Sequence, residues 1–232
     1  MKPFNSPRIP PTLSRAESET LVKLLTLHFA YPLAYPLAGA YFEEIFAQAV
    51  GGKRETRKLL FDLLREGTGW SLKTHIRSNV NTGSSFEVVV QRCDILRNRN
   101  LTIASPVESL GNAIAHHFNQ WAIGSVERQE VFDPRAGFLL RNRTETNFVF
   151  FQQRYRLYDP SEVTWRWATE QERSLMGFVA DDLVFRWYRS GTQLFGVYRI
   201  PNAAYEFKIS GHRADLDATL AFFASQGVAG TN

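Results

Sequence analysis

The feature that most constrains the fold is a change of pattern along the chain. The first half carries apolar residues at helical spacing, whereas the second half contains aromatic-rich segments that read as strands. These segments are 147–158, 163–167, 183–188, 193–200 and 205–209. Turns such as Asp159-Pro160 and Pro201-Asn202 separate several of them. The pattern predicts an α/β (α+β) fold in one domain, with a mixed sheet flanked by helices and a β-rich C-terminal half.

Helix signals are clearest near the N-terminus. Ser14 and Glu17 have capping-box spacing and open a helix that extends to about Phe29. The segment 31–36 breaks that helix, and a second helix is expected from Pro36 until Gly51-Gly52 stops it. An extended arm over 1–13 and two further helices over 105–121 and 212–225 complete this part of the prediction.

Two strands are expected in the first half. Residues 70–76 alternate as a strand should, and 86–96 form the strongest strand candidate, with a polar turn between them. Residues 53–66 allow two interpretations. Leucines at helical spacing would place Asp62 on a helix, whereas a helix ending near Arg57 would leave a strand to Leu64.

Composition excludes several classes of protein. No apolar run approaches the roughly 20 residues of a membrane span, and the polar, Pro-rich N-terminus has no apolar signal core. The single cysteine, Cys93, excludes an internal disulfide and a multi-cysteine zinc site, so we expect a cytoplasmic protein. Only six of the 27 basic residues are lysines. Guanidinium groups suit phosphate and guanine, although a genomic bias toward arginine would give the same imbalance.

The segment 61–75 carries the most chemistry. Asp62 is followed by a Gly-rich bend and then by a strand that bears Lys73. A carboxylate and a strand carbonyl, here that of Leu72, can hold Mg²⁺ with several waters retained. A lysine beside them can stabilise the attacking hydroxide or the developing pentavalent phosphate. The alternative is ordinary: a surface acid and an exposed strand lysine.

The order of these elements resembles the PD-(D/E)xK nuclease core of type II restriction endonucleases over about residues 36–96. The resemblance implies a Mg²⁺-dependent enzyme that cleaves double-stranded DNA, with Asp62 as the first acid and Lys73 as the lysine. It also implies a homodimer, because cutting both strands of a palindrome needs two sites related by a two-fold axis. A cognate DNA methyltransferase is expected in the same system.

One position departs from the family pattern. The residue two before the lysine, usually acidic, is Ser71. Glu44 on the second helix or Glu87 on the next strand would then complete the metal site. We expect Glu44 near the edge of the apolar face of that helix and Glu43 further into solvent, with a solvated flank charge as the alternative for Glu44. The apolar face is expected to contain Leu37, Tyr41, Phe42, Ile45, Phe46 and Ala49.

Two polar clusters are candidates for DNA contact. One contains Arg77, Asn79 and Asn81, and the other contains Arg186, Arg189 and Gln193. Arginine reads guanine and glutamine or asparagine reads adenine in the major groove. The alternative is that both are ordinary polar turns and that Trp187, within the second cluster, packs in a core.

His212 and Asp215 carry a rival hypothesis. They are three residues apart at the start of the last helix and would form an acid/base dyad on one face. Such a dyad would suit a metal-independent enzyme that excises DNA bases, whereas an aspartate there also caps a helix. A DNA-binding protein without catalysis is the third possibility.

Overall fold

The protein is described here from a computed structural model that covers residues 9–32, 36–57, 59–98, 100–169, 173–210 and 213–226. The chain folds into helices and two separate β-sheets, which confirms the predicted α+β class with a mixed sheet. Among the described residues, no helix is both long enough and apolar enough to cross a membrane.

Two helices open the fold. Helix α1 (Arg15–Ala30) begins at the predicted capping box, in which the Ser14 and Glu17 side chains each bond the other's backbone N–H. Helix α2 (Gly39–Val50) starts three residues later than predicted and ends at Gly51, whose φ of 66° is the left-handed conformation that glycine adopts easily. Of the predicted N-terminal arm, residues 9–13 are described, and the Pro11 carbonyl accepts a hydrogen bond from the Gln152 N–H.

The larger sheet is mixed. Its strands, in spatial order, are β1 (Lys53–Arg54), β2 (Leu63–Arg65), β3 (Thr68–Arg77), β5 (Asp133–Asn142), β6 (Asn147–Arg154) and β11 (Tyr205–Lys208). Only β3 and β5 run parallel, over ten paired residues each; the other neighbours are antiparallel. The connection between the parallel strands includes the long helix α4 (Val107–Arg128), as a parallel crossover requires.

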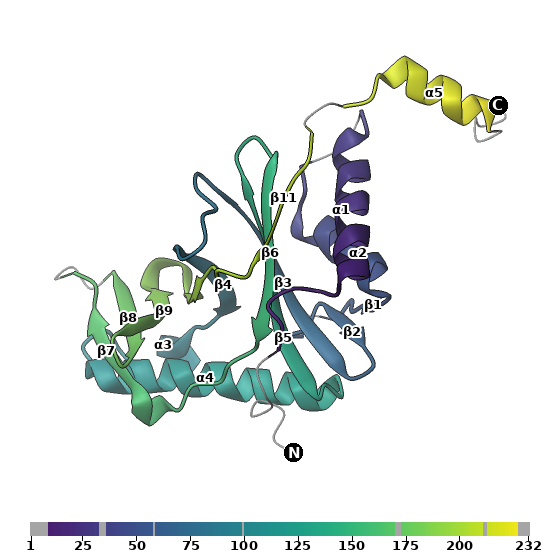
Figure 1. Ribbon diagram of the computed structural model, residues 1–232. Helices are drawn as coiled ribbons and strands as arrows, with labels where there is room; N and C mark the ends of the chain where they lie inside the picture. The colour runs from purple at the N-terminus through teal and green to yellow at the C-terminus, as the bar shows by residue number, and fades with distance from the viewer. Residues whose placement is uncertain are drawn as a thin grey trace.

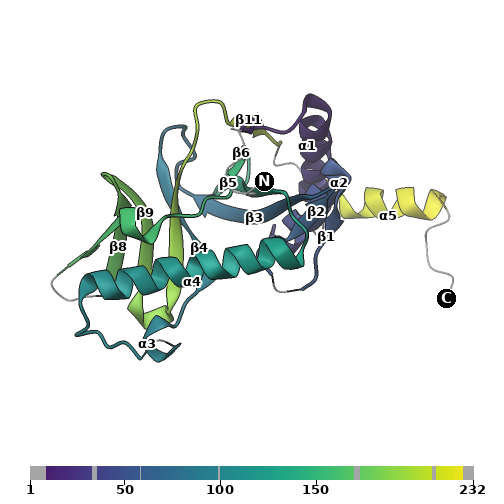
Figure 2. The ribbon, with the colours of Figure 1, turned by 90° about the horizontal axis from the view of Figure 1, so that it is seen from below.

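The second sheet is entirely antiparallel. Its strands, in spatial order, are β4 (Ser85–Arg92), β10 (Gln193–Arg199), β9 (Asp182–Tyr188), β8 (Ser174–Val179) and β7 (Val163–Trp167). Short helices α3 (Ile95–Asn98), η2 (Pro160–Glu162) and η3 (Arg189–Gly191) lie in its connections, and α5 (Leu216–Ser225) follows β11. Helix α4 passes along the second sheet and reaches the first (Figure 2).

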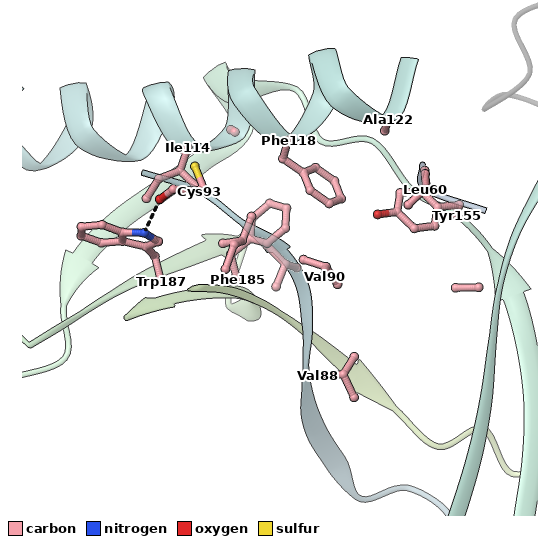
Figure 3. Packing of buried hydrophobic residues seen from close by; sticks show 14 of the residues in the cluster. Leu60, Val88, Val90, Cys93, Ile114, Phe118, Ala122, Tyr155, Phe185 and Trp187 are labelled. Carbon is pink, nitrogen blue, oxygen red and sulfur yellow. Dashed lines mark hydrogen bonds between the residues drawn. The ribbon is translucent and has the colours of Figure 1, made fainter. Parts of the chain in front are cut away.

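Each face of the mixed sheet has its own core. One core lies between this sheet, α4 and the second sheet (Figure 3), and the other lies between the opposite face and helices α1 and α2 (Figure 1). Trp187 is fully buried and its Nε1 donates to the Cys93 carbonyl at 3.1 Å, so it packs in a core as the alternative interpretation required. On β3, Trp70 and Leu72 belong to the α2 side. Alternation therefore directs Ser71 and Lys73 to the other face.

Three strands were not predicted. The two-residue strand β1 lies where both interpretations of 53–66 placed a helix. Strand β5 lies between β3 and β6 and is buried on both faces, so its near-continuous apolar run Phe138-Leu139-Leu140 lacks the alternation of a half-exposed strand. Strand β8 contains Gly177, which weakens a strand signal. The predicted strand 86–96 ends at Arg92, and β4 belongs to the second sheet rather than to the sheet that carries Lys73.

Candidate active site

Asp62 lies in the bend immediately before β2, on neither a helix nor a strand. Its N–H donates to the Trp70 carbonyl and its own carbonyl accepts from the Glu55 N–H, both at 2.8 Å. These two bonds fix the backbone of Asp62 between neighbouring segments. Its Oδ2 accepts a hydrogen bond of 2.7 Å from the Leu72 N–H. The side chain is therefore held against β3 by the local chain path.

Lys73 reaches back to the same point. Its Nζ lies 3.5 Å from Asp62 Oδ2, 3.0 Å from the Leu72 carbonyl oxygen and 3.2 Å from Ser71 Oγ. Strand β2 pairs only with Thr68 to Trp70, so this part of the β3 edge lies beyond the ladder and its Leu72 N–H and carbonyl bond side chains instead. Three oxygens thus converge on one cation at the edge of the sheet.

The electrostatics of Asp62 differ from those of a simple ion pair. Burial raises the pKa of the Asp62 carboxyl above its usual value, and the negative charge of Glu43 adds to that rise. The Lys73 ammonium and the Leu72 N–H act in the opposite direction. A carboxylate that is desolvated and close to another acid gains from a cation, which is a property of many functional sites.

Glu43, not Glu44, is the helix acid on this side of α2. The sequence-based placement of the two was wrong: Glu43 is half-buried and pairs with Arg54 at 2.9 Å, whereas Glu44 is exposed. The buried face of α2 is centred on Phe42 and Phe46. The predicted apolar face included Tyr41, which is in fact half-exposed. Including it placed the centre of the predicted face further from Glu43 than the buried face is. Glu44 instead lines a groove between helices and accepts a hydrogen bond from Gln48.

Glu87 is not brought to Asp62. It lies on β4 in the second sheet, where its carboxylate accepts from Arg186 Nε at 2.8 Å and from the Tyr188 hydroxyl at 3.4 Å. The prediction that Glu87 could complete the metal site assumed that the strand after Lys73 stays in the same sheet. That strand pairs with β10 instead, a partner more than 100 residues later in the chain.

The first predicted DNA-contact cluster extends from the end of β3. Arg77 Nη1 donates to the Ser85 carbonyl at 2.9 Å, and its guanidinium lies 5.6 Å from the centroid of the Phe86 ring. Asn79 and Asn81 form a turn in which the Asn81 N–H donates to Asn79 Oδ1 at 2.8 Å. Arg77 lies four residues after Lys73 on β3, so strand alternation places both on the same face. This cluster therefore continues the strand that bears the candidate site.

His75 is a residue that sequence reasoning missed. It stands between Lys73 and Arg77 on the same face of β3, and strand alternation from Lys73 was the signal that would have found it. Desolvation lowers the pKa of the His75 imidazole, and the positive charges of Arg77 and Arg141 lower it further.

The second predicted cluster lies on the other sheet. Arg186 is paired with Glu87 on β4, Arg189 opens the short helix η3, and Gln193 begins β10 opposite Arg92 and Tyr188. The two clusters therefore occupy different sheets, and the guanidinium of Arg186 already has a carboxylate partner.

Only one residue of the predicted acid/base dyad, Asp215, belongs to the described residues. His212 lies outside the described residues. Asp215 is the N-cap of α5, and its Oδ1 accepts a hydrogen bond of 2.8 Å from the Ala218 N–H. Its carboxylate therefore has the capping role that competed with the catalytic interpretation.

Comparison with models of protein families, with curated proteins and with solved structures found no match for this chain. Within the part of the chain that the structure describes, no three His, Cys, Asp or Glu side chains gather into a metal-binding group. The site is thus one close carboxylate, a hydroxyl, a carbonyl and a lysine, with Glu43 as the nearby second acid.

Proposed function

We propose that this chain is a Mg²⁺-dependent type II restriction endonuclease that hydrolyses phosphodiester bonds of double-stranded DNA. The observation that carries the proposal is the convergence of the Asp62 carboxylate, the Leu72 carbonyl and the Ser71 hydroxyl on the Lys73 ammonium. A point where oxygens gather around a cation at an open sheet edge is suited to a hard metal ion and to a phosphate brought against it.

The donor set fits Mg²⁺. All three groups around the lysine present oxygen, and Mg²⁺ prefers oxygen ligands while keeping several of its waters. Asp62 and the Leu72 carbonyl would hold the ion, and Glu43 would contribute the second negative charge that Ser71 does not supply. When bound, Mg²⁺ would neutralise charge that develops on the phosphate.

Lys73 would act on the nucleophile. In the hydrolysis, the oxygen of water bonds to phosphorus, one phosphorus–oxygen bond to a sugar breaks, and the leaving oxygen gains a proton to balance the one that the water loses. The Lys73 Nζ would orient that water and stabilise its developing negative charge. Displacement of Nζ from the Leu72 carbonyl and Asp62 would free those oxygens for the metal.

Charge and position support DNA as the substrate. The chain has a formal charge of +4 and is rich in arginine, which favours binding to a polyanion. Arg77, Asn79 and Asn81 continue the strand of Lys73 and would contact DNA beside the cleaved bond. Arg186, Arg189 and Gln193 would contact it from the second sheet. Two copies would act on the two strands, alongside a cognate methyltransferase that protects the host DNA.

The test is incubation of the purified protein with unmethylated phage DNA in Mg²⁺ and, in parallel, in EDTA. Discrete fragments only with Mg²⁺, lost in Lys73→Ala and kept in the matched surface variant Lys208→Ala, are expected. Intact DNA in both conditions would reject nuclease activity; sequence-dependent retention without cleavage would identify a non-catalytic DNA-binding protein. Breaks that appear in EDTA after heat or alkali would instead indicate base excision.

A further inference from the structure

Exposed apolar side chains gather in one part of the molecule. Of the eleven large apolar side chains that lie exposed among the described residues, seven belong to α1, α2, α5 or their immediate ends. They are Leu27, Tyr31, Tyr41, Leu216, Leu220, Phe222 and Phe223. Single exposed apolar residues are ordinary, but five of these seven, all except Leu216 and Leu220, line one groove, and such a group marks an interaction surface.

Helix α5 contributes four of them and has no buried residue. It extends away from the body beyond the end of α1, and Figures 1 and 2 show this from two directions. Around the helix, its leucines and phenylalanines occupy one broad sector, while the opposite sector contains Asp217 and small residues. An apolar helical face of this width is normally packed against protein.

A groove lies beside this helix. It has a volume of about 660 Å³ and lies between α1, α2 and one side of α5. Its walls follow two stripes of side chains at i, i+3, i+4 and i+7 spacing. One stripe runs along α1 to its C-cap and contains Leu24, Leu27, His28 and Tyr31. The other lies on α2 and contains Tyr41, Glu44, Ile45 and Gln48. Phe222 and Phe223 line its remaining side, and Leu216 and Leu220 of α5 do not contribute to the lining.

We propose that this surface binds a second copy of the chain, with α5 of each protomer packing into the α1–α2 groove of the other. Each chain carries both an apolar helix and an apolar groove. A reciprocal exchange of helices about a two-fold axis would bury both surfaces and would give a closed dimer with no further binding site left open. The inference rests on apolar surface alone and is independent of the proposed nuclease activity.

The exposed area agrees with a dimer. The seven large side chains are on average about half exposed and together present roughly 700 Å² per protomer. A standard stable interface buries roughly 800 Å² per partner. Charge disfavours a membrane as the occupant: α5 has no lysine or arginine, and Asp215 and Asp217 stand at its start, where an anionic lipid surface would repel them.

The first experiment measures the mass of the full chain in solution by sedimentation equilibrium. Wild type is expected to be dimeric at low micromolar concentration, and Phe222→Asp should weaken the dimer by about 30-fold or more, because a buried aromatic anchor is lost. The matched variant Ala221→Asp, which adds the same charge one residue away and outside the groove, should remain dimeric. A monomeric wild type at about 100 µM, or equal effects of the two variants, would overturn the proposal.

The second experiment distinguishes exchange from α5 closing on its own groove. One tagged chain carries Leu27→Cys and a second chain with a different tag carries Phe222→Cys. The two chains are mixed and then oxidised. A disulfide between the two tags is expected, and the fully buried Cys93 should not compete with it. A disulfide that forms only within one chain, when both substitutions are in that chain, would show that α5 covers its own groove and would reject the exchange.

Discussion

Two ion pairs, Asp62–Lys73 at the edge of β3 and Glu87–Arg186 in the second sheet, have similar exposure but different surroundings. The side chains are 24% and 30% exposed in the first pair and 29% and 23% in the second. Glu87 and Arg186 meet at 2.8 Å, while Asp62 and Lys73 are 3.5 Å apart, with two further oxygens on the ammonium. The Asp62–Lys73 pair is the looser one, and it has several oxygens that another cation could use. We therefore expect the metal chemistry at this pair and not at the pair in the second sheet.

The largest expected effect separates the two acids. Asp62→Asn should lower the rate of DNA cleavage by about 1000-fold or more, because a bound metal ion supplies several kcal/mol to the transition state. Glu87→Gln should lower it by less than about tenfold, since its partner is Arg186. Initial rates on a plasmid with one site measure both. Equal losses in the two variants would mean that Glu87 belongs to the site after all.

The two cations should differ in the kinetic constant that they change. Lys73→Ala should reduce kcat by about 100-fold or more, as the loss of one group that stabilises developing charge does. Arg186→Ala should mainly raise KM, because it would remove a DNA contact and leave the reacting groups in place. Titration of Mg²⁺ by calorimetry provides the control, with binding retained in Lys73→Ala. A Lys73→Ala variant with normal kcat would exclude lysine from the chemistry.

A smaller effect is expected from the neighbouring acids of α2. Glu43→Gln should slow cleavage by about tenfold, because a carboxylate that reaches the ion through a water or a ligand changes metal affinity by that order. Glu44→Gln, one residue along the same helix, should have no effect on the rate. The pair of variants tests which face of α2 contributes to the site, and an equal or inverted result would reject the assignment of Glu43.

The sequence allowed prediction of features that depend on near neighbours. Ser14 and Glu17 located the start of α1, Gly51 located the end of α2, and the Asp62–Lys73 pair could be inferred because the two lie eleven residues apart on either side of a bend. Features set by distant pairing could not be inferred. Strand β4 joins the second sheet through β10, and β5 loses its alternation because both of its faces are covered.

The choice between Glu43 and Glu44 failed for a related reason. Adjacent helix residues differ by about 100° around the axis, so the outcome depends on how the whole helix is rotated against the sheet. That rotation is set by Phe42 and Phe46 packing into the core, together with residues of β3 and β6 such as Trp70 and Phe150. No local signal in the sequence of α2 contains this information.

The smallest expected effect is on the free energy of unfolding. Removing the charge of Asp62 should raise it, whereas removing one partner of an ion pair usually lowers it. Because the folded-state pKa of Asp62 is raised, the folded protein prefers the protonated carboxyl, and stability falls as pH rises from the ordinary value of 3.8 through the folded value. Above that folded value the ionised Asp62 therefore costs stability, and Asp62→Asn should recover it. Glu87→Gln should instead lose about 0.5 kcal/mol, as for a partly exposed ion pair.

Urea denaturation of the two variants at pH 4 and pH 7 measures this difference, and Mg²⁺ sharpens it. The stability gain of Asp62→Asn over wild type should be larger at pH 7 than at pH 4. Saturating Mg²⁺, at about 100 times its dissociation constant, should stabilise wild type and Glu87→Gln by about 2.7 kcal/mol and leave Asp62→Asn unchanged. Binding of the ion thus offsets the cost of the buried, ionised Asp62, which links the desolvated carboxylate at the β3 edge to the function proposed for it. A Mg²⁺ response that survives in Asp62→Asn would place the metal elsewhere.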